Sequence, residues 1–445
     1  MLKAIILTIV WCFIYFIVSD KILMCLPLGL LAFFVAYLEK RGSLSIKHLF
    51  IITIIGFVYI STYYFNYQNL LSPYGDDALF LSESKSEQIQ ILNIFPLLLN
   101  FLSFLIQPLN FNDQDFLFLV YIHLWILYAW FISLSYKVFI ALIPLNVNFK
   151  LYSTFLLGLY LIQWSFIHVY RDLFLFFLIF IAIDFILKKR FLPVIVLVIP
   201  IFFLRGGTFM LVFAACVLFR YRDFLLNGST AFIKLTKILL IALVTLIMST
   251  AFSYIVPFMS RFGNIEGNDS NATLVSFLDK RTNFFTSNEQ IHDQVTYKIM
   301  QQNWIVKSIA LPSVNIVSPV KFSGLSIKNK RVSFKFNITY MNNYLDYSNI
   351  FQVIHIIVMS VFLPFLVVNF KEYFSYSSNT FAFVIITIIF MVSVSFISFV
   401  PRHRVLFLVP LAFISSTRFE NFNYHKIKPF VFLTLSFLIA YNLLY

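Results

Sequence analysis

The chain has 445 residues, of which 60% are hydrophobic, 20% are aromatic and only 12% are charged. A soluble domain is about half apolar and about one quarter charged, so this composition excludes an ordinary soluble protein. The net charge of +14 would suit a nucleic-acid partner, but an excess of lysine and arginine is also normal in the cytoplasmic loops of membrane proteins, and we expect no nucleic acid here.

Apolar runs of bilayer-spanning length, about 17 to 25 residues, recur along the whole chain and predict an all-α, multi-pass integral membrane protein. We expect about 13 transmembrane helices, within a range of roughly 11 to 15. Two further apolar segments, 91–109 and 138–147, are expected to be interfacial or re-entrant. The predicted spans are residues 2–19, 22–38, 48–66, 115–134, 151–168, 171–187, 191–204, 206–219, 234–256, 350–369, 379–399, 405–417 and 428–445.

Lysine and arginine are unevenly distributed between alternate short loops. With the N-terminus inside, the opposite side keeps few cations outside its one long loop, which satisfies the positive-inside rule. The predicted cytoplasmic cations are Lys40, Arg41, Lys47, Lys137, Lys150, Lys188, Lys189, Arg190, Arg220, Arg222, Lys234, Lys237, Arg418, Lys426 and Lys428. Residues 1–256 therefore form a membrane domain of nine spans, 257–349 form a large outer loop, and 350–445 form the last four spans.

The outer loop contains a strand pattern. RVSFKFNITY (331–340) alternates apolar and polar residues, and the preceding VKFSGLSI with the turn-like KNKR suggests a partner strand. We therefore expect a β-hairpin inside residues 257–349. The three cysteines of the chain fall in apolar runs without metal spacing, and no Gly-rich phosphate loop or Cys/His cluster occurs, so we expect neither a metal nor a cofactor.

Charged residues gather at four predicted helix ends on the outer face. Each group alone has a structural explanation: an acid favours the first turn of a helix, and arginine can anchor at headgroups. Together they indicate a partner, because ionisable groups at membrane depth cost about 2.5–3.5 kcal/mol each. The groups are His168 with Arg171 and Asp172; Arg205; Arg402, His403 and Arg404; and Asp76 with Asp77.

Arginine points to phosphate as that partner. Its guanidinium presents a fixed fork of donors and stays charged at every physiological pH. Arginines that converge at the outer interface would fit the diphosphate of a lipid-linked sugar. Such a donor also meets an energetic need, because nucleotide sugars are absent outside the cytoplasm and the sugar must arrive already activated on its lipid. Arginines would stabilise the departing diphosphate without a metal.

The layout of the chain resembles the O-antigen and capsule repeat-unit polymerases (Wzy type). The similarity comprises the many spans, the single large outer loop in the second half, the Arg-Asp pair at a span start and the late Pro-Arg-His-Arg motif at 401–404. GDDALF (75–80) followed by NIFPLLLNFL (93–102) also resembles the early outer segment of exopolysaccharide polymerases. The chain lacks the arginine followed eleven residues later by glycine that some members carry in outer loops.

The resemblance implies a metal-independent membrane glycosyltransferase of the bacterial inner membrane. It would join oligosaccharide repeats carried on undecaprenyl diphosphate into a surface polysaccharide at the periplasmic face, with a chain-length regulator as a candidate partner. The diphosphate would be held by Arg171, Arg205, Arg402 and Arg404. The base that takes the proton of the acceptor hydroxyl would be His403, His168, Asp172, or Asp76 with Asp77.

Three alternatives remain open at the level of the sequence. An O-antigen ligase uses the same donor with a lipid core as acceptor. A membrane glycosyltransferase with a monophosphate lipid donor often carries an outer acidic pair that ligates a metal or activates the acceptor, as Asp76 and Asp77 would. A flippase or transporter is less favoured, because such proteins place charges near the midplane in two related halves, and this chain shows no repeat.

The remaining buried ionisable residues are expected to be structural. Asp184 lies four residues before Lys188, so an intrahelical ion pair is predicted near the cytoplasmic end of that span. His123 and His355 lie inside predicted spans, where packing or interhelical hydrogen bonds are the favoured interpretation.

Overall fold

The computed structural model describes only part of the chain, and five predicted spans, 2–19, 22–38, 48–66, 206–219 and 234–256, lie outside the described residues. The described residues are 99–101, 103–104, 113–159, 171–188, 190–204, 299, 302–317, 325–328, 331–334, 340–341, 344–345, 348–397, 405–419 and 424–444.

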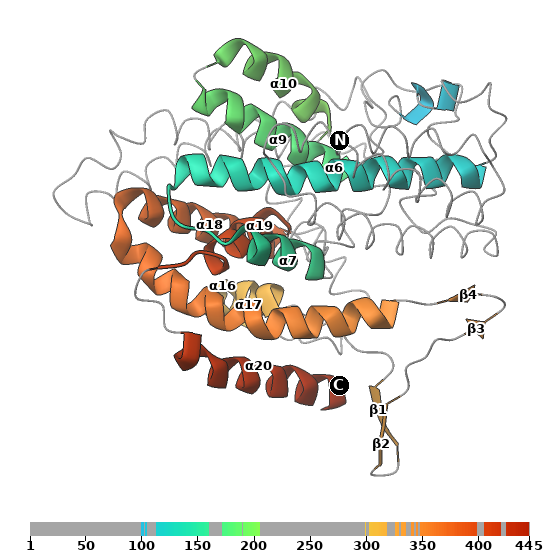
Figure 1. Ribbon diagram of the computed structural model, residues 1–445, viewed down its shortest axis with the longest axis vertical. Helices are drawn as coiled ribbons and strands as arrows, with labels where there is room; N and C mark the ends of the chain where they lie inside the picture. Colours follow the sequence, from blue (N-terminus) through green and yellow to red (C-terminus); the bar gives the residue numbers. More distant parts are fainter. Residues whose placement is uncertain are drawn as a thin grey trace, which may run out of the picture.

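The described part is predominantly helical (Figure 1). Its helices are α6 (Asp113–Leu142), α7 (Phe149–Gly158), α9 (Arg171–Leu187), α10 (Phe191–Leu204), α16 (Trp304–Val317), α17 (Ser348–Tyr376), α18 (Ser378–Ile397), α19 (Val405–Ser415) and α20 (Tyr424–Leu444). The predicted spans 171–187 and 191–204 coincide with α9 and α10, and the last four predicted spans coincide with α17 to α20 apart from shifts at their ends.

One helix among the described residues is long and apolar enough to cross a membrane, Val353–Phe374 within α17. Four shorter apolar stretches lie in other helices: Trp130–Leu142, Leu173–Leu187, Asn379–Ile388 and Ile427–Ala440.

Segment 138–147, predicted as a separate interfacial or re-entrant element, is not one. Its first half continues α6, which runs unbroken for 30 residues, or about 45 Å, to Leu142. No glycine or proline interrupts the chain before Pro144, which lacks an N–H group and disfavours a helical residue before it. The predicted span 115–134 and the apolar stretch after it are therefore one helix.

The predicted span 151–168 is not continuous either. Helix α7 starts at Asn148, whose side-chain oxygen accepts hydrogen bonds from the backbone N–H groups of Lys150 (3.1 Å) and Leu151 (3.4 Å), as an N-cap residue does. The helix ends at Gly158, and Leu159 after it is extended (φ −75°, ψ 101°). Residues 160–168 lie outside the described part.

Residues 257–349 contain the strands that the alternation predicts. Strand β1 (Leu325–Lys328) pairs antiparallel with β2 (Arg331–Phe334). Within the predicted strand 331–340, the first four residues form β2, and Tyr340 starts β3 (Tyr340–Met341), which pairs with β4 (Tyr344–Leu345); residues 335–339 lie outside the described part. Helix α16 in the same region was not predicted. Lys307 and the pairs Pro312-Ser313 and Ser318-Pro319 keep its apolar run below span length.

The described helices alternate in direction (Figure 1). Helices α6, α9, α17 and α19 run one way, and α7, α10, α18 and α20 run the other way. For α7 and α17 the contacts give the direction directly, because Phe155 meets Phe362 (5.3 Å between ring centroids) while Gly158 faces Val358. This division is the one that the predicted topology requires, with the first group entering from the outer side and the second group from the inner side.

An aromatic core joins the central helices. The ring of Phe139 on α6 contacts Phe180 of α9 (5.3 Å), Phe383 of α18 (5.3 Å) and Phe413 of α19 (4.8 Å between centroids). Edge-to-face aromatic pairs of this kind contribute about 0.5–1.5 kcal/mol each beyond the area they bury. Phe139 therefore fixes four helices around one point.

A polar joint ties together the loop after α6, the last turns of α17 and the end of α19. It comprises Asn146–Asn148, Asn369–Tyr373 and Ser416–Arg418. The backbone N–H of Asn148 donates to Ser416 O (2.9 Å), and the backbone N–H of Arg418 donates to Asn146 O (2.8 Å). The joint connects the loop after α6, the last turns of α17 and the residues after α19.

Gly158 permits the close approach of α7 to α17. A Cβ atom at this position would lie 2.4 Å from Val358 Cγ2, well inside van der Waals contact. We expect Gly158→Ala to lower the free energy of unfolding by about 1–3 kcal/mol through overpacking. Thermal unfolding of the detergent-solubilised protein measures this, and Val358→Ala combined with Gly158→Ala is expected to recover most of the loss. Unchanged stability of the single variant would contradict the close packing.

Candidate functional site

Two of the predicted site residues fall within the described part. Arg171 is the first residue of α9 and Asp172 the second. The remaining seven lie outside the described residues: His168, Arg205, Arg402, His403, Arg404, Asp76 and Asp77. Their placement is therefore constrained only through the helices that adjoin them in the chain.

Helices α9 and α10 form a hairpin that brings Arg171 and Leu204 to one end. The connection is only three residues long, 188–190, and the two helices pack against each other. An antiparallel pair with so short a connection must have the start of α9 and the end of α10 on the same side (Figure 1). The hairpin therefore brings to one end Arg171 and Leu204, the residue that immediately precedes Arg205 in the sequence.

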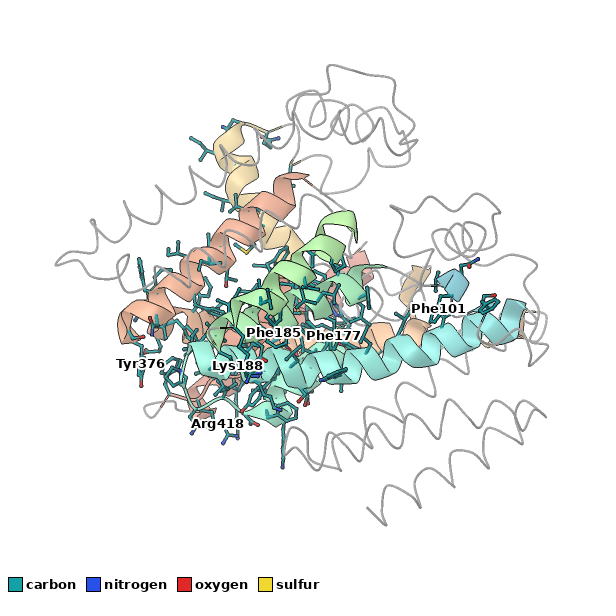
Figure 2. The ribbon with its side chains drawn as sticks, turned by 90° about the horizontal axis from the view of Figure 1, so that it is seen from above. Phe101, Phe177, Phe185, Lys188, Tyr376 and Arg418 are labelled. Atoms are coloured by element: carbon teal, nitrogen blue, oxygen red, sulfur yellow. The ribbon has the colours of Figure 1, made fainter. Side chains whose placement is uncertain are left out.

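The opposite end of this hairpin carries the predicted ion pair. Lys188 Nζ lies 2.5 Å from Asp184 Oδ2, which confirms the intrahelical pair expected from their spacing. Figure 2 shows Lys188, Arg418 and Tyr376 at one end of the described part and Phe101 at the other. Lys188 and Arg418, two of the cations predicted to be cytoplasmic, thus lie at the end opposite to the start of α9.

The C-terminal end of α7 and the N-terminal end of α19 lie at similar heights along the bundle axis. They are antiparallel, because Asn148 bonds to Ser416 and, further along, Tyr152 contacts Phe413 (6.0 Å between ring centroids). Counted from that ring contact at 1.5 Å per residue, the end of α7 lies about 9 Å away and the start of α19 about 12 Å away in the same direction. The end of α7 and the start of α19 therefore differ in height by only a few ångströms.

The start of α9 lies at the same height. The ring of Phe177, six residues after Arg171, contacts Trp130 of α6 (4.6 Å), which puts Arg171 about 9 Å beyond that contact. Tyr128, one half-turn before Trp130, donates its hydroxyl to Leu156 O near the end of α7. The ends of α7 and α9 thus agree in height to within a few ångströms.

The lateral spacing of these ends is also limited. Helices α9 and α19 both reach Phe139 of α6 through Phe180 and Phe413. Helix α9 packs on α6, and α7 packs on both α6 and α19. The starts of α9 and α19 and the end of α7 therefore lie at the same end of one group of packed helices, the end that is predicted to face outwards.

The electrostatics of this region favour an anion. Two N-terminal helix ends, those of α9 and α19, each carry about half a positive charge from aligned peptide dipoles. The residue before Val405 in the sequence is Arg404, and α9 starts at Arg171. One C-terminal end, that of α7, opposes them, but the hydroxyl of Tyr128 occupies one of its carbonyl oxygens, Leu156 O.

Neither the histidines nor a metal-binding cluster indicates a further site among the described residues. His355 on α17 is buried and has a polar or electrostatic contact, in keeping with the structural role expected for it. His123 lies on α6. Among the residues that the structure describes, no group of three or more His, Cys, Asp or Glu side chains gathers closely enough to hold a metal ion.

Sequence reasoning missed one polar residue with many contacts. Asn369, fully buried on α17, donates from Nδ2 to Ile414 O (2.9 Å), Ser415 O (3.1 Å) and Thr417 O (2.9 Å). Ile414 and Ser415 are the last two residues of α19 and Thr417 lies just beyond it, where helices leave carbonyl acceptors unsatisfied. The only signal in the sequence is an isolated amide within the apolar run FLVVNF (365–370).

Comparisons of this chain with protein-family models, with curated proteins and with solved structures find no match.

Proposed function

We propose that this protein is a multi-pass membrane enzyme that polymerises lipid-diphosphate-linked oligosaccharide repeats into a surface polysaccharide. The donor would be undecaprenyl-diphosphate-linked oligosaccharide, and the site would face the periplasm of the bacterial inner membrane. The observation that carries the proposal is the convergence of the starts of α9 and α19 at one end of the bundle, next in sequence to Arg171 and to the Arg-His-Arg motif.

Exposed apolar surface supports placement in a bilayer. On α20 the outward side chains Phe432, Leu433 and Phe437 are 69%, 68% and 60% exposed, while Ile427 and Leu438 on the other side of the helix are buried. Soluble proteins rarely leave apolar patches of this kind uncovered, whereas acyl chains cover them without cost. The complete set of about 13 spans, with residues 257–349 outside, belongs to this proposal.

The proposed chemistry follows from the charge at the converging helix ends. The acceptor hydroxyl of one repeat attacks the anomeric carbon of the other, the bond from that carbon to the diphosphate oxygen breaks, and the lipid diphosphate leaves with the bonding electrons. The proton of the hydroxyl passes to the base, for which His403, His168, Asp172 and the pair Asp76–Asp77 remain candidates. Arg171, Arg205, Arg402 and Arg404, together with two helix N-termini, would stabilise the negative charge on the departing diphosphate.

The proposal is tested by the surface polysaccharide of a strain from which this gene has been deleted. We expect a lipid core capped with a single repeat and no ladder of longer chains on an electrophoretic gel, restored by the gene on a plasmid. A bare core with lipid-linked polymer accumulating inside would instead identify a ligase, and an incomplete repeat would identify a single-sugar transferase. An unchanged ladder would contradict every one of these activities.

A further inference from the structure

Helix α16 lies in the region predicted as an extramembrane loop, yet it packs against the bundle. It contacts α18, and in both views it lies beside the bundle within the length of the other helices (Figures 1 and 2). Leu311 on its inner face is fully buried, and Ile316 packs against the core. The helix is therefore a docked part of the bundle and not a segment that extends away from it.

The outer face of α16 is an aliphatic stripe. Ile305, Val306 and Ile309 are 54%, 40% and 67% exposed, and their spacing of three and four residues places them side by side on one face. The helix starts after exposed, polar Gln302 and Asn303, and Asn303 Oδ1 accepts a hydrogen bond from the backbone N–H of Val306 (2.9 Å). A polar start thus gives way to an apolar outer face within one turn.

The same pattern occurs on the other helices at the periphery of the described part. Exposed large apolar side chains are found on α10 (Leu192 and Val196), on α17 and on α20, whereas α7, α9, α18 and α19 show none among the described residues. Helix α16 packs on central α18 as α20 packs on α17. Its stripe therefore continues the apolar outer surface that the bundle presents elsewhere.

We infer that α16 is inserted into the outer leaflet of the bilayer, with Ile305, Val306 and Ile309 in contact with lipid acyl chains. Its 14 residues measure about 21 Å, which is too short to cross the hydrocarbon core of about 30 Å but long enough to enter one leaflet. The inference rests on the proposed placement in a membrane and not on the proposed chemistry. It makes α16 a lipid-embedded anchor in the stretch of chain that leads to the β1–β2 hairpin.

Spin labelling of single cysteines tests this in the full-length protein reconstituted into phosphatidylcholine vesicles. Cys12, Cys25 and Cys216 are first replaced by alanine, and a nitroxide is then attached at Ile309→Cys. Collision with apolar oxygen and with a water-soluble nickel complex reports whether the label is in lipid or in water. Phe437→Cys on α20 is the matched lipid-facing control, and Asn303→Cys is the matched polar control on the same segment.

We expect the label at position 309 to resemble the one at 437, with oxygen collisions several-fold more frequent than nickel collisions, and the label at 303 to show the reverse. Nickel accessibility at 309 equal to that at 303 would place α16 in water and overturn the inference. An immobile label shielded from both reagents would mean that protein, such as a second copy, covers the stripe, and would overturn it too. If the label at 437 is also in water, the membrane placement itself fails, independently of any result for polymerisation.

Discussion

Replacing Arg171 with lysine is expected to abolish the polysaccharide ladder while leaving the protein folded and in the membrane. Lysine keeps the positive charge at the start of α9 but loses the planar fork that binds two phosphate oxygens at once. Removing one donor to a developing oxyanion typically costs about 10²–10³ in rate. The measurement is the chain-length distribution of surface polysaccharide in a deletion strain that expresses the variant, with protein abundance measured in parallel.

Arg190→Lys is the matched control for this variant. Arg190 is exposed in the turn at the opposite end of the same helical hairpin, so the substitution changes the same side-chain type on the side away from the site. We expect it to leave the ladder unchanged. A normal ladder from Arg171→Lys would count against bidentate diphosphate binding, and a loss of abundance with a proportional loss of ladder would assign Arg171 a structural role at the helix start.

Replacing Asn369 with aspartate is expected to prevent stable folding. The asparagine amide gives its two N–H groups to three carbonyl oxygens at the C-terminal end of α19, in a fully buried position. An ionised aspartate supplies no donor and puts a negative charge against those carbonyls. Leaving a buried charge without a partner costs about 3–5 kcal/mol, which is a large share of the stability of a typical protein.

Size-exclusion profiles and thermal unfolding in detergent measure this effect. Thr387→Val is a matched control, because the buried hydroxyl of Thr387 bonds only to Phe383 O (2.8 Å), a carbonyl of its own helix among the described residues. We expect the control to change the free energy of unfolding by about 1 kcal/mol or less. Equal stability of Asn369→Asp and Thr387→Val would show that the polar joint does not stabilise the ends of α17 and α19.

Neighbouring contacts in the polar joint explain why Asn369 matters more than its own three bonds. Tyr373, one turn further along α17, places its hydroxyl 2.6 Å from Thr417 Oγ1, and Thr417 also pairs with Val147 in an isolated bridge. Loss of Asn369 would free the end of α19 and with it the contact to the loop after α6. Because the start of α19 adjoins the Arg-His-Arg motif, the joint also determines where that end of the helix lies relative to α9.

The sequence by itself determined the positions of several of the described helices. Apolar runs such as 171–187 and 191–204 became α9 and α10 with the same ends, because a long apolar run without a breaker favours a helix, and the charged residues at 188–190 interrupt it. The alternation at 325–334 likewise located the β1–β2 pair, and the four-residue spacing of Asp184 and Lys188 predicted their ion pair.

The tertiary structure alone decided which helix ends meet. Gly158, the last residue of α7, is a local signal for a helix end, but its tight packing against Val358, two hundred residues later in the chain, follows only from the fold. In the sequence Asn369 is an isolated polar residue. Its hydrogen-bond acceptors are carbonyls at the end of α19, more than 40 residues away in the chain. The convergence of the ends of α7, α9 and α19 has the same origin: local pattern fixes a helix, but its height and neighbours follow from side chains that pack across long sequence separations.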